Sequence, residues 1–135
     1  KTLKNATEAE AVAGVAGVVA LNDVTARDLQ FKDSQWTRAK GFDTFCAVGT
    51  PKEGTFDFGA LEVVTRVNGV ERQRAHGSDM VLSVPYPLSS GSHAMTLEPG
   101  DAIATGTPAG VGPLAAGDVV EVEIVGVSSV KNSVR

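Results

Sequence analysis

The chain has 135 residues, enough for one domain, and 42% of them are hydrophobic against 21% charged, a composition that argues against a disordered tail. Lys and Arg number 12 against 16 Asp and Glu, and the net charge of −4 argues against nucleic acid as the main partner. No apolar run approaches the roughly 20 residues of a membrane span. With no signal peptide visible, we expect a cytoplasmic protein without a membrane partner.

The first pattern in the chain is a helix start. Thr7 and Glu10 have the spacing of a capping box, in which each side chain accepts a hydrogen bond from the backbone N–H of the other residue. Gly14 and Gly17 limit the length of the helix that follows. Residues 18–21 are all apolar, and we interpret them as a short buried strand, although the run is too short for periodicity alone to distinguish it from a core helix.

Strand patterns dominate the later part of the chain. Residues 61–67 place apolar side chains and one threonine on a single face, and Asn68-Gly69 predicts a type I′ hairpin with residues 70–73 as the return strand. Residues 119–125 place Val120, Val122 and Ile124 on one face with Glu121 and Glu123 opposite. Together with the 15 glycines and 6 prolines, these patterns predict a mainly β fold with minor α.

Two shorter runs are more ambiguous. Residues 80–84 form an apolar run that is a further strand signal and is closed by Pro85 and Pro87, and residues 102–105 form a predicted short strand that enters a loop rich in Gly and Pro. Pro87 and Gly91 are expected to interrupt any helix in the stretch of residues 86–91.

Three segments could carry chemistry, and the first runs from Asn22 to Gln30. In a helix after Asp23, the side chains of Asp23, Arg27 and Gln30 would lie on one face, offering an oxygen ligand for Mg²⁺ or Mn²⁺, a fixed cation and an amide. Arg27 could hold a substrate carboxylate with two parallel hydrogen bonds. The alternative is a solvated Asp–Arg pair on a helix surface.

The second segment combines aromatic side chains with a lysine. Trp36, Phe42 and Phe45 surround Lys40 in the sequence, and partial burial would strengthen the effect of its charge on a developing anion. The alternative is an amphipathic loop in which the lysine extends its charged end to solvent.

The third segment, residues 105–113, is a glycine-rich loop. Its backbone N–H groups could hold a carboxylate with the Thr107 hydroxyl directed at substrate, or it could be a plain turn. It lacks the Lys-Ser/Thr ending of a phosphate loop. His76 or His93 could act as a base, but neither has a nearby Ser or Cys nucleophile at a supporting spacing, and we expect both to be surface or hairpin residues. We expect the single cysteine, Cys46, to be a small buried side chain that forms no internal disulfide.

Taken in order, these motifs resemble the fumarylacetoacetate hydrolase family. The resemblance is carried by residues 22–30, residues 36–43 and residues 95–112, and it spans nearly the whole chain. It implies a β-roll-like catalytic domain with mixed sheets, usually dimeric, that binds Mg²⁺ or Mn²⁺ through three carboxylates. Members of the family cleave C–C bonds in 2,4-dioxo acids, decarboxylate oxaloacetate-like acids or isomerise unsaturated 2-oxo diacids from aromatic breakdown.

The resemblance also implies roles for residues of this chain. Asp23 matches a metal ligand and Thr44 a neighbour of the metal site. Arg27 and Gln30 match residues of the substrate pocket. Lys40 matches a catalytic lysine near metal and substrate, and Thr107 matches the threonine of the substrate-binding loop.

Other parts of the family pattern do not match. The Glu-x-Glu pair that supplies two metal ligands and the catalytic His and Glu of a lid precede the Asp23 motif in the family, whereas here Glu8 and Glu10 belong to the capping box. We therefore expect residues 1–135 to be the C-terminal part of a single catalytic domain.

The sequence thus predicts a metal-dependent enzyme that acts on small 2-oxo acids. Hydrolysis of a C–C bond in an acylpyruvate- or fumarylacetoacetate-like substrate through a metal-stabilised enolate is favoured. A 2-hydroxyhepta-2,4-diene-1,7-dioate-type isomerase and an oxaloacetate decarboxylase are alternatives within the family. A catalytically incomplete domain for binding or assembly is the alternative from another class.

Overall fold

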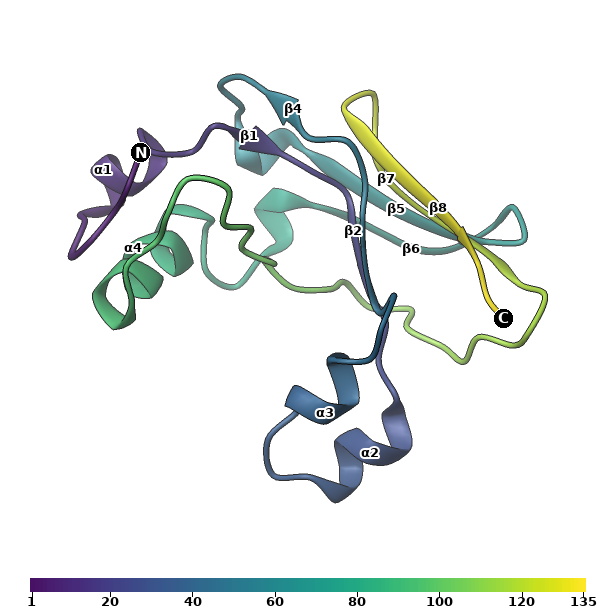
Figure 1. Ribbon diagram of the computed structural model, residues 1–135. Helices are drawn as coiled ribbons and strands as arrows, with labels where there is room; N and C mark the ends of the chain where they lie inside the picture. Colours follow the sequence, from purple (N-terminus) through teal and green to yellow (C-terminus); the bar gives the residue numbers. More distant parts are fainter.

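The computed structural model describes residues 1–135 and is built mainly from strands (Figure 1). The strands are β1 (Gly17–Val18), β2 (Leu21–Asp23), β3 (Cys46–Val48), β4 (Lys52–Glu53), β5 (Glu62–Val67), β6 (Val70–His76), β7 (Val119–Ile124) and β8 (Ser128–Ser133). The helices are α1 (Glu8–Val12), α2 (Arg27–Lys32), α3 (Thr37–Lys40) and α4 (Pro85–Ala94), with 3₁₀ turns at Phe58–Ala60 and Gly77–Asp79. The predicted class, mainly β with minor α, is confirmed. No helix has the length and apolar character that a membrane crossing would require.

A four-stranded antiparallel sheet in the order β6-β5-β7-β8 is the largest unit. Along β7, Val120, Val122 and Ile124 are buried, which confirms the predicted face. The last two pack with Ala20 into a core that is extended by partly buried neighbours: Val18, Leu61, Val63, Val127 and Val130. Alternating burial along the strand therefore fixes which face of the sheet is covered.

The predicted hairpin turn is confirmed in detail. Asn68 and Gly69 have φ values of 52° and 79°, both positive as a type I′ turn requires. The strand after the turn runs to His76, three residues beyond the predicted end. Its pairing with β5 slips between Thr65 and Arg66, so that Arg72 is an extra residue without a partner. This irregularity is a β-bulge. It lies in the part of β6 that contacts the glycine-rich loop of residues 105–113.

A second, smaller core lies between α1 and α4. The capping box is confirmed, because the Thr7 N–H donates to Glu10 Oε2 at 2.9 Å and the Glu10 N–H donates to Thr7 Oγ1 at 3.3 Å. Ala11 of α1 and Leu88 of α4 are both buried in this core. Ser92 Oγ accepts from the Ala6 N–H at 2.9 Å and so ties α4 to the N-terminal segment.

The expectation that Pro87 and Gly91 interrupt a helix is wrong, since both lie within α4. Pro85 and Pro87 fall in the first turn, where the backbone N–H groups have no acceptor inside the helix and a proline loses nothing. Gly91 destabilises the helix by about 1 kcal/mol relative to an alanine at the same position. The packing of Leu88 and the Ser92 hydrogen bond keep the helix in place despite that cost.

Three further predictions need correction. Residues 18–21 are not one buried strand, because Val18 ends β1, Leu21 begins β2, and these two strands pair in different two-stranded sheets. Residues 102–105 and 80–84 form no strand, because neither run finds a neighbouring strand to pair with, and Val81 is fully exposed. Cys46 is exposed rather than buried: along β3 only Ala47 is partly buried, and Cys46 and Val48 on either side of it are exposed.

The segment between β2 and β3 forms a pair of short helices, α2 and α3. In Figure 1 this pair extends away from both the sheet and the α1–α4 unit. The chain leaves the body through β2 and returns through β3, and these strands pair with Asp23 opposite Cys46. The candidate site residues at positions 23 to 44 are therefore carried by this projecting unit.

Candidate functional site at the end of strand β2

Lys40 and Asp23 meet at the junction of β2 and the helical pair. The Lys40 ammonium donates to Asp23 Oδ2 and, at 3.2 Å, to Thr25 Oγ1. The Thr25 hydroxyl in turn donates to the Asp23 backbone carbonyl at 3.2 Å. The side chains of Lys40 and Asp23 are 31% and 46% exposed, so that both remain accessible to a small molecule.

Backbone contacts place Lys40 at this point. The Ala26 N–H donates to the Ala39 carbonyl at 2.9 Å, and Ala39 is fully buried. Because Ala39 precedes Lys40 directly, anchoring it sets where the lysine side chain begins. The short helix α3 therefore positions its last residue against the start of α2.

An ion pair links the far ends of the same two helices. Arg38 donates from Nε and Nη2 to the two carboxylate oxygens of Asp33 at 2.9 and 2.8 Å. Hydrogen bonding by the guanidinium lowers the pKa of Asp33, and the carboxylate raises the pKa of Arg38. Both groups lie at the surface, so this pair orients α3 more than it stabilises the fold.

The predicted stripe of Asp23, Arg27 and Gln30 forms only in part. Arg27 Nη1 donates to Gln30 Oε1 at 2.5 Å on the surface of α2. Asp23 precedes the helix and pairs with Lys40, so the solvated Asp–Arg pair considered as an alternative is not formed. Arg27 therefore carries a positive charge without a carboxylate partner.

The aromatic residues are near Lys40 but do not enclose it. A shallow surface hollow is lined by Ser34, Gln35, Trp36, Thr37 and Lys40. Phe42 and Phe45 stack against each other in a tilted arrangement, with ring centroids 5.3 Å apart. Trp36 and Phe42 are 55% and 47% exposed, and the hollow is correspondingly open.

Thr44 is held in a strained conformation. Its φ of 71° lies in the left-handed region, which β-branched residues rarely adopt and which costs roughly 1–3 kcal/mol. It lies two residues before Cys46, the residue that pairs with Asp23. Backbone strain thus occurs close to the predicted metal ligand.

Thr107 comes from a different part of the chain. The loop that carries it lies against β6, where Gln73 Nε2 donates to Thr107 Oγ1 at 3.1 Å and to the Pro108 carbonyl at 2.7 Å. Gly106 and Gly110 have φ values of 122° and 102°, which explains the need for glycine at both positions.

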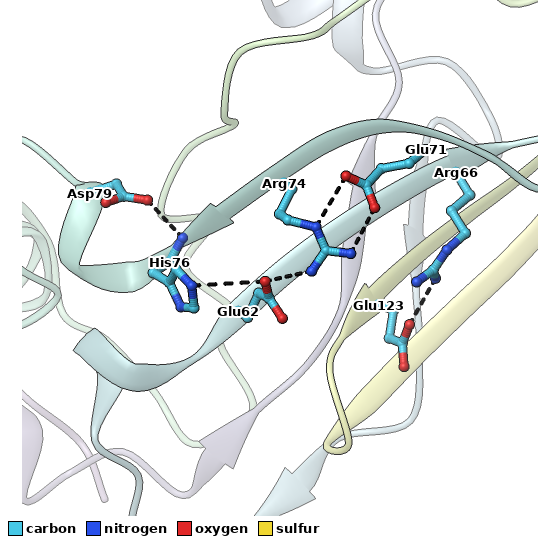
Figure 2. Close-up of polar contacts among 7 residues, drawn as sticks. All are labelled: Glu62, Arg66, Glu71, Arg74, His76, Asp79 and Glu123. Carbon is cyan, nitrogen blue, oxygen red and sulfur yellow. Dashed lines mark hydrogen bonds and ion pairs between the residues drawn. The ribbon is translucent and has the colours of Figure 1, made fainter.

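The two histidines lie outside this group. His76 Nε2 is 3.8 Å from Glu62 Oε1, at the end of an ion-pair network on β5 and β6 (Figure 2). In that network the carboxylates of Glu71 and Glu62 raise the pKa of Arg74, and the guanidinium lowers the pKa of Glu71. His93 lies in the last turn of α4. Neither imidazole forms a hydrogen bond with Asp23, Lys40 or Thr107.

The side chains of this chain do not form a complete metal site by themselves. No group of three or more His, Cys, Asp or Glu side chains lies close enough to hold a metal ion. Asp23 offers a single carboxylate, whereas Mg²⁺ requires about six oxygen ligands. The chemistry of Asp23 fits one ligand to a hard cation, and the remaining ligands do not come from clustered side chains of this chain.

The comparisons with known proteins agree with the motif order. A family model described as fumarylacetoacetate (FAA) hydrolase C-terminal matches residues 1–135. The chain belongs to the fumarylacetoacetate hydrolase family. Those relatives that have a described activity include a hydrolase, an isomerase and a tautomerase, while others have no described activity.

Three relatives illustrate the family. The mitochondrial oxaloacetate tautomerase FAHD1 of Mus musculus is 44% identical over 134 residues, covering 95% of this chain and 61% of that protein. The structure of 2-hydroxyhepta-2,4-diene-1,7-dioate isomerase from Mycobacterium marinum matches with a TM-score of 0.93 at 46% identity and covers 98% of this chain and 53% of that chain. Fumarylacetoacetate hydrolase from Exiguobacterium antarcticum gives a TM-score of 0.93 at 42% identity, with coverages of 100% and 52%. The chain thus spans between about half and three fifths of the length of these relatives.

Sequence reasoning missed two residues that contact the predicted site. Thr25 lies within the recognised motif, but its hydroxyl could have been linked to Lys40 only by knowing that α3 folds back on α2. Gln73 was assigned to a return strand, and no local pattern connects it with a loop more than thirty residues later.

Proposed function

We propose that this chain contributes to an enzyme that stabilises the enolate of a small 2-oxo acid, with Lys40 as the catalytic residue and Arg27, Gln30 and Thr107 as substrate-binding residues. The observation that carries the proposal is the accessible Lys40 ammonium, held by Asp23 and Thr25 close to the start of α2. The family membership supports it, since relatives with a described activity include an oxaloacetate tautomerase and a fumarylacetoacetate hydrolase.

Lys40 has the donors that the reaction requires. An ammonium group has three N–H donors, and two of them bond to Asp23 and Thr25. The third is available to the 2-oxo oxygen of a substrate. As negative charge develops on that oxygen, the interaction strengthens, and this difference between ground and transition state lowers the barrier.

Arg27 and Gln30 would bind the carboxylate end of the substrate. The guanidinium has five N–H donors, of which one bonds to Gln30, so a bidentate contact with a carboxylate remains available. Gln30 limits the rotation of Arg27 and so keeps its remaining donors oriented.

Asp23 would serve as one ligand of a Mg²⁺ or Mn²⁺ ion, with Thr44 as a neighbour of that site. Its Oδ2 accepts from Lys40, while Oδ1 accepts no hydrogen bond from the protein and is available to a cation. When bound, such an ion supplies Lewis-acid stabilisation of the enolate charge. Lys40 supplies a second positive charge beside the same carboxylate.

Hydrolysis of a C–C bond in an acylpyruvate- or fumarylacetoacetate-like substrate is the reaction we propose first. Keto–enol tautomerisation of oxaloacetate is the second candidate, and the description of the 44% identical mouse relative favours it. Isomerisation of an unsaturated 2-oxo diacid and decarboxylation of oxaloacetate use the same enolate. We further propose a homodimer, which light scattering of the purified protein would test. We also propose that the protein is cytoplasmic.

A substrate panel tests the proposal. The protein is assayed with Mg²⁺, Mn²⁺ or a chelator against an acylpyruvate, oxaloacetate and an unsaturated 2-oxo diacid. We expect turnover of one of them that the chelator removes, and Asp23→Ala should abolish that turnover and weaken Mn²⁺ binding measured by calorimetry. Asp28→Ala removes an exposed carboxylate of the same motif and is the matched control.

The result that contradicts the proposal is equally specific. If Asp23→Ala retains normal turnover and normal Mn²⁺ binding, the metal assignment is wrong. If no substrate reacts under any condition, the alternative of a domain for binding or assembly is favoured.

A further inference from the structure

The loop that carries Thr107 has little hydrogen bonding of its own. Residues 102–114 form no backbone–backbone hydrogen bond, either among themselves or with the rest of the chain. The only protein hydrogen bonds to this stretch are the two from the Gln73 carboxamide, to Thr107 Oγ1 and to the Pro108 carbonyl. The Gln73 side chain therefore makes all the hydrogen bonds that hold this long irregular segment, while Ile103 near its start packs against the α1–α4 core.

The loop approaches β6 closely at the same point. A Cβ added to Gly110 would lie 2.0 Å from the Arg72 carbonyl oxygen and 3.2 Å from Gln73 Cγ. Arg72 is the extra residue of the β-bulge. Bulges bend a strand and redirect its side chains, and they occur often beside active sites. The loop lies against the strand through three features: the bulge at Arg72, the absence of a Cβ at Gly110 and the hydrogen bonds of the Gln73 carboxamide.

The direction of the hydrogen bonds determines what Thr107 can do. A carbonyl oxygen only accepts, so the contact with Pro108 requires the amide nitrogen of Gln73 at this position. The same NH₂ group then donates its other hydrogen to Thr107 Oγ1. Because the Thr107 oxygen accepts, its own O–H hydrogen is left to donate to a ligand.

We infer that Gln73 is a positioning residue that holds the Thr107 loop on β6 and presents the Thr107 hydroxyl as a hydrogen-bond donor to the substrate. The ligand class that this donor suits is an acid with a carboxylate or an enolate oxygen. This inference rests on the proposed function for the identity of the substrate, but the holding of the loop does not depend on it.

Two substitutions test whether Gln73 holds the loop. Gln73→Met keeps the side-chain length and removes both hydrogen bonds, whereas Gln73→Glu places a carboxylate against the Pro108 carbonyl and accepts the Thr107 hydrogen itself. In ¹⁵N relaxation measurements of the chain, the order parameters of Thr107 and Gly110 should fall from about 0.85, the value of rigid backbone, to below about 0.6 in both variants. Those of β5 and β7 should not change.

The kinetic test asks whether Gln73 acts through Thr107. With the substrate that the panel identifies, Gln73→Glu should raise KM about tenfold with little change in kcat, as expected when binding alone is weakened. In a Thr107→Val background the same substitution should have no further effect on KM, which a merely structural role of Gln73 would not produce. Val81→Ala, at a fully exposed position, is the control.

Each outcome decides the inference. Unchanged order parameters at Thr107 and Gly110 in both variants overturn it, whatever the activity. Increased loop motion with an unchanged KM in Gln73→Glu overturns the assignment of Thr107 as the presented donor. If no substrate of the panel reacts with the unmodified protein, the proposed function fails, while the relaxation result still decides whether Gln73 holds the loop.

Discussion

The four-stranded sheet and the α2–α3 unit use their residues in different ways. In the sheet, β7 alternates buried apolar and partly exposed acidic side chains, and the strands are paired throughout except at the β-bulge at Arg72. In the helical unit, Ala39 is the only buried residue, while Phe31, Trp36 and Phe42 are exposed. The sheet can therefore contribute most of the folding free energy. The candidate site residues lie in the α2–α3 unit, where local stability is low.

The largest effect we expect concerns activity alone. Replacing Lys40 by methionine removes the charge beside Asp23 but keeps the length of the side chain. With the substrate of the panel, kcat should fall by about 100- to 1000-fold, as when a preorganised electrostatic group is lost. The melting temperature should hardly change, because the pair is partly exposed. A variant that melts far below the original protein would place Lys40 among the structural residues instead.

A substitution in the sheet should show the opposite pattern. Ile124 is 7% exposed and packs against Ala20 and Val122, and Ile124→Ala should lower the free energy of unfolding by about 2–4 kcal/mol. Well below the melting temperature, kcat should be unchanged. Denaturant unfolding measures the loss, with the exposed Val81→Ala as the matched control. A loss of kcat in the still folded Ile124→Ala protein would show that the two regions are coupled.

The smallest effect that we expect concerns the contact between the β5–β6 turn and the start of β7. The Asp118 carboxylate accepts from the Ala115 N–H and the Asn68 amide, both at 2.8 Å, and these bonds lower the pKa of Asp118. A lowered pKa in the folded state means that the charged form stabilises the fold at neutral pH. That stabilisation is lost as the pH falls below about 4, through the folded-state pKa.

Asp118→Asn should therefore melt below the original protein at pH 7, and the gap should narrow towards pH 3. Thermal unfolding followed by circular dichroism measures both values. Asp43→Asn, whose carboxylate accepts no protein hydrogen bond, should show no such gap at either pH. A gap for Asp118→Asn that stays constant down to pH 3 would contradict this account.

Local patterns predicted the elements whose causes are themselves local. The Thr7–Glu10 capping box, the turn at Asn68-Gly69 and the alternation of β7 each depend on residues that are close in sequence, and all are confirmed. The apolar runs at 80–84 and 102–105 failed as strands because a strand also needs a partner, which no local pattern shows. Pro87 failed as a helix breaker because its effect depends on its place in the helix.

The site was predictable as a set of residues but not as an arrangement. The motif containing Asp23, Arg27 and Gln30 was found, yet the partner of Asp23 is Lys40, brought there by the turn between α2 and α3. The contact between Gln73 and Thr107 joins a strand to a distant loop and follows only from the tertiary structure. Their roles in catalysis remain predictions for the experiments above.

The pairing of β2 with β3 has a consequence for how such a protein can diversify. The polypeptide enters and leaves the segment between Asp23 and Cys46 through adjacent strands, with those two residues directly opposite each other. Because the entry and exit points are fixed by this pairing, insertions, deletions or exchanges within the segment need not disturb the register of the larger sheet. The segment between β2 and β3 can therefore change in length or sequence during evolution while the pairing of the scaffold strands is kept.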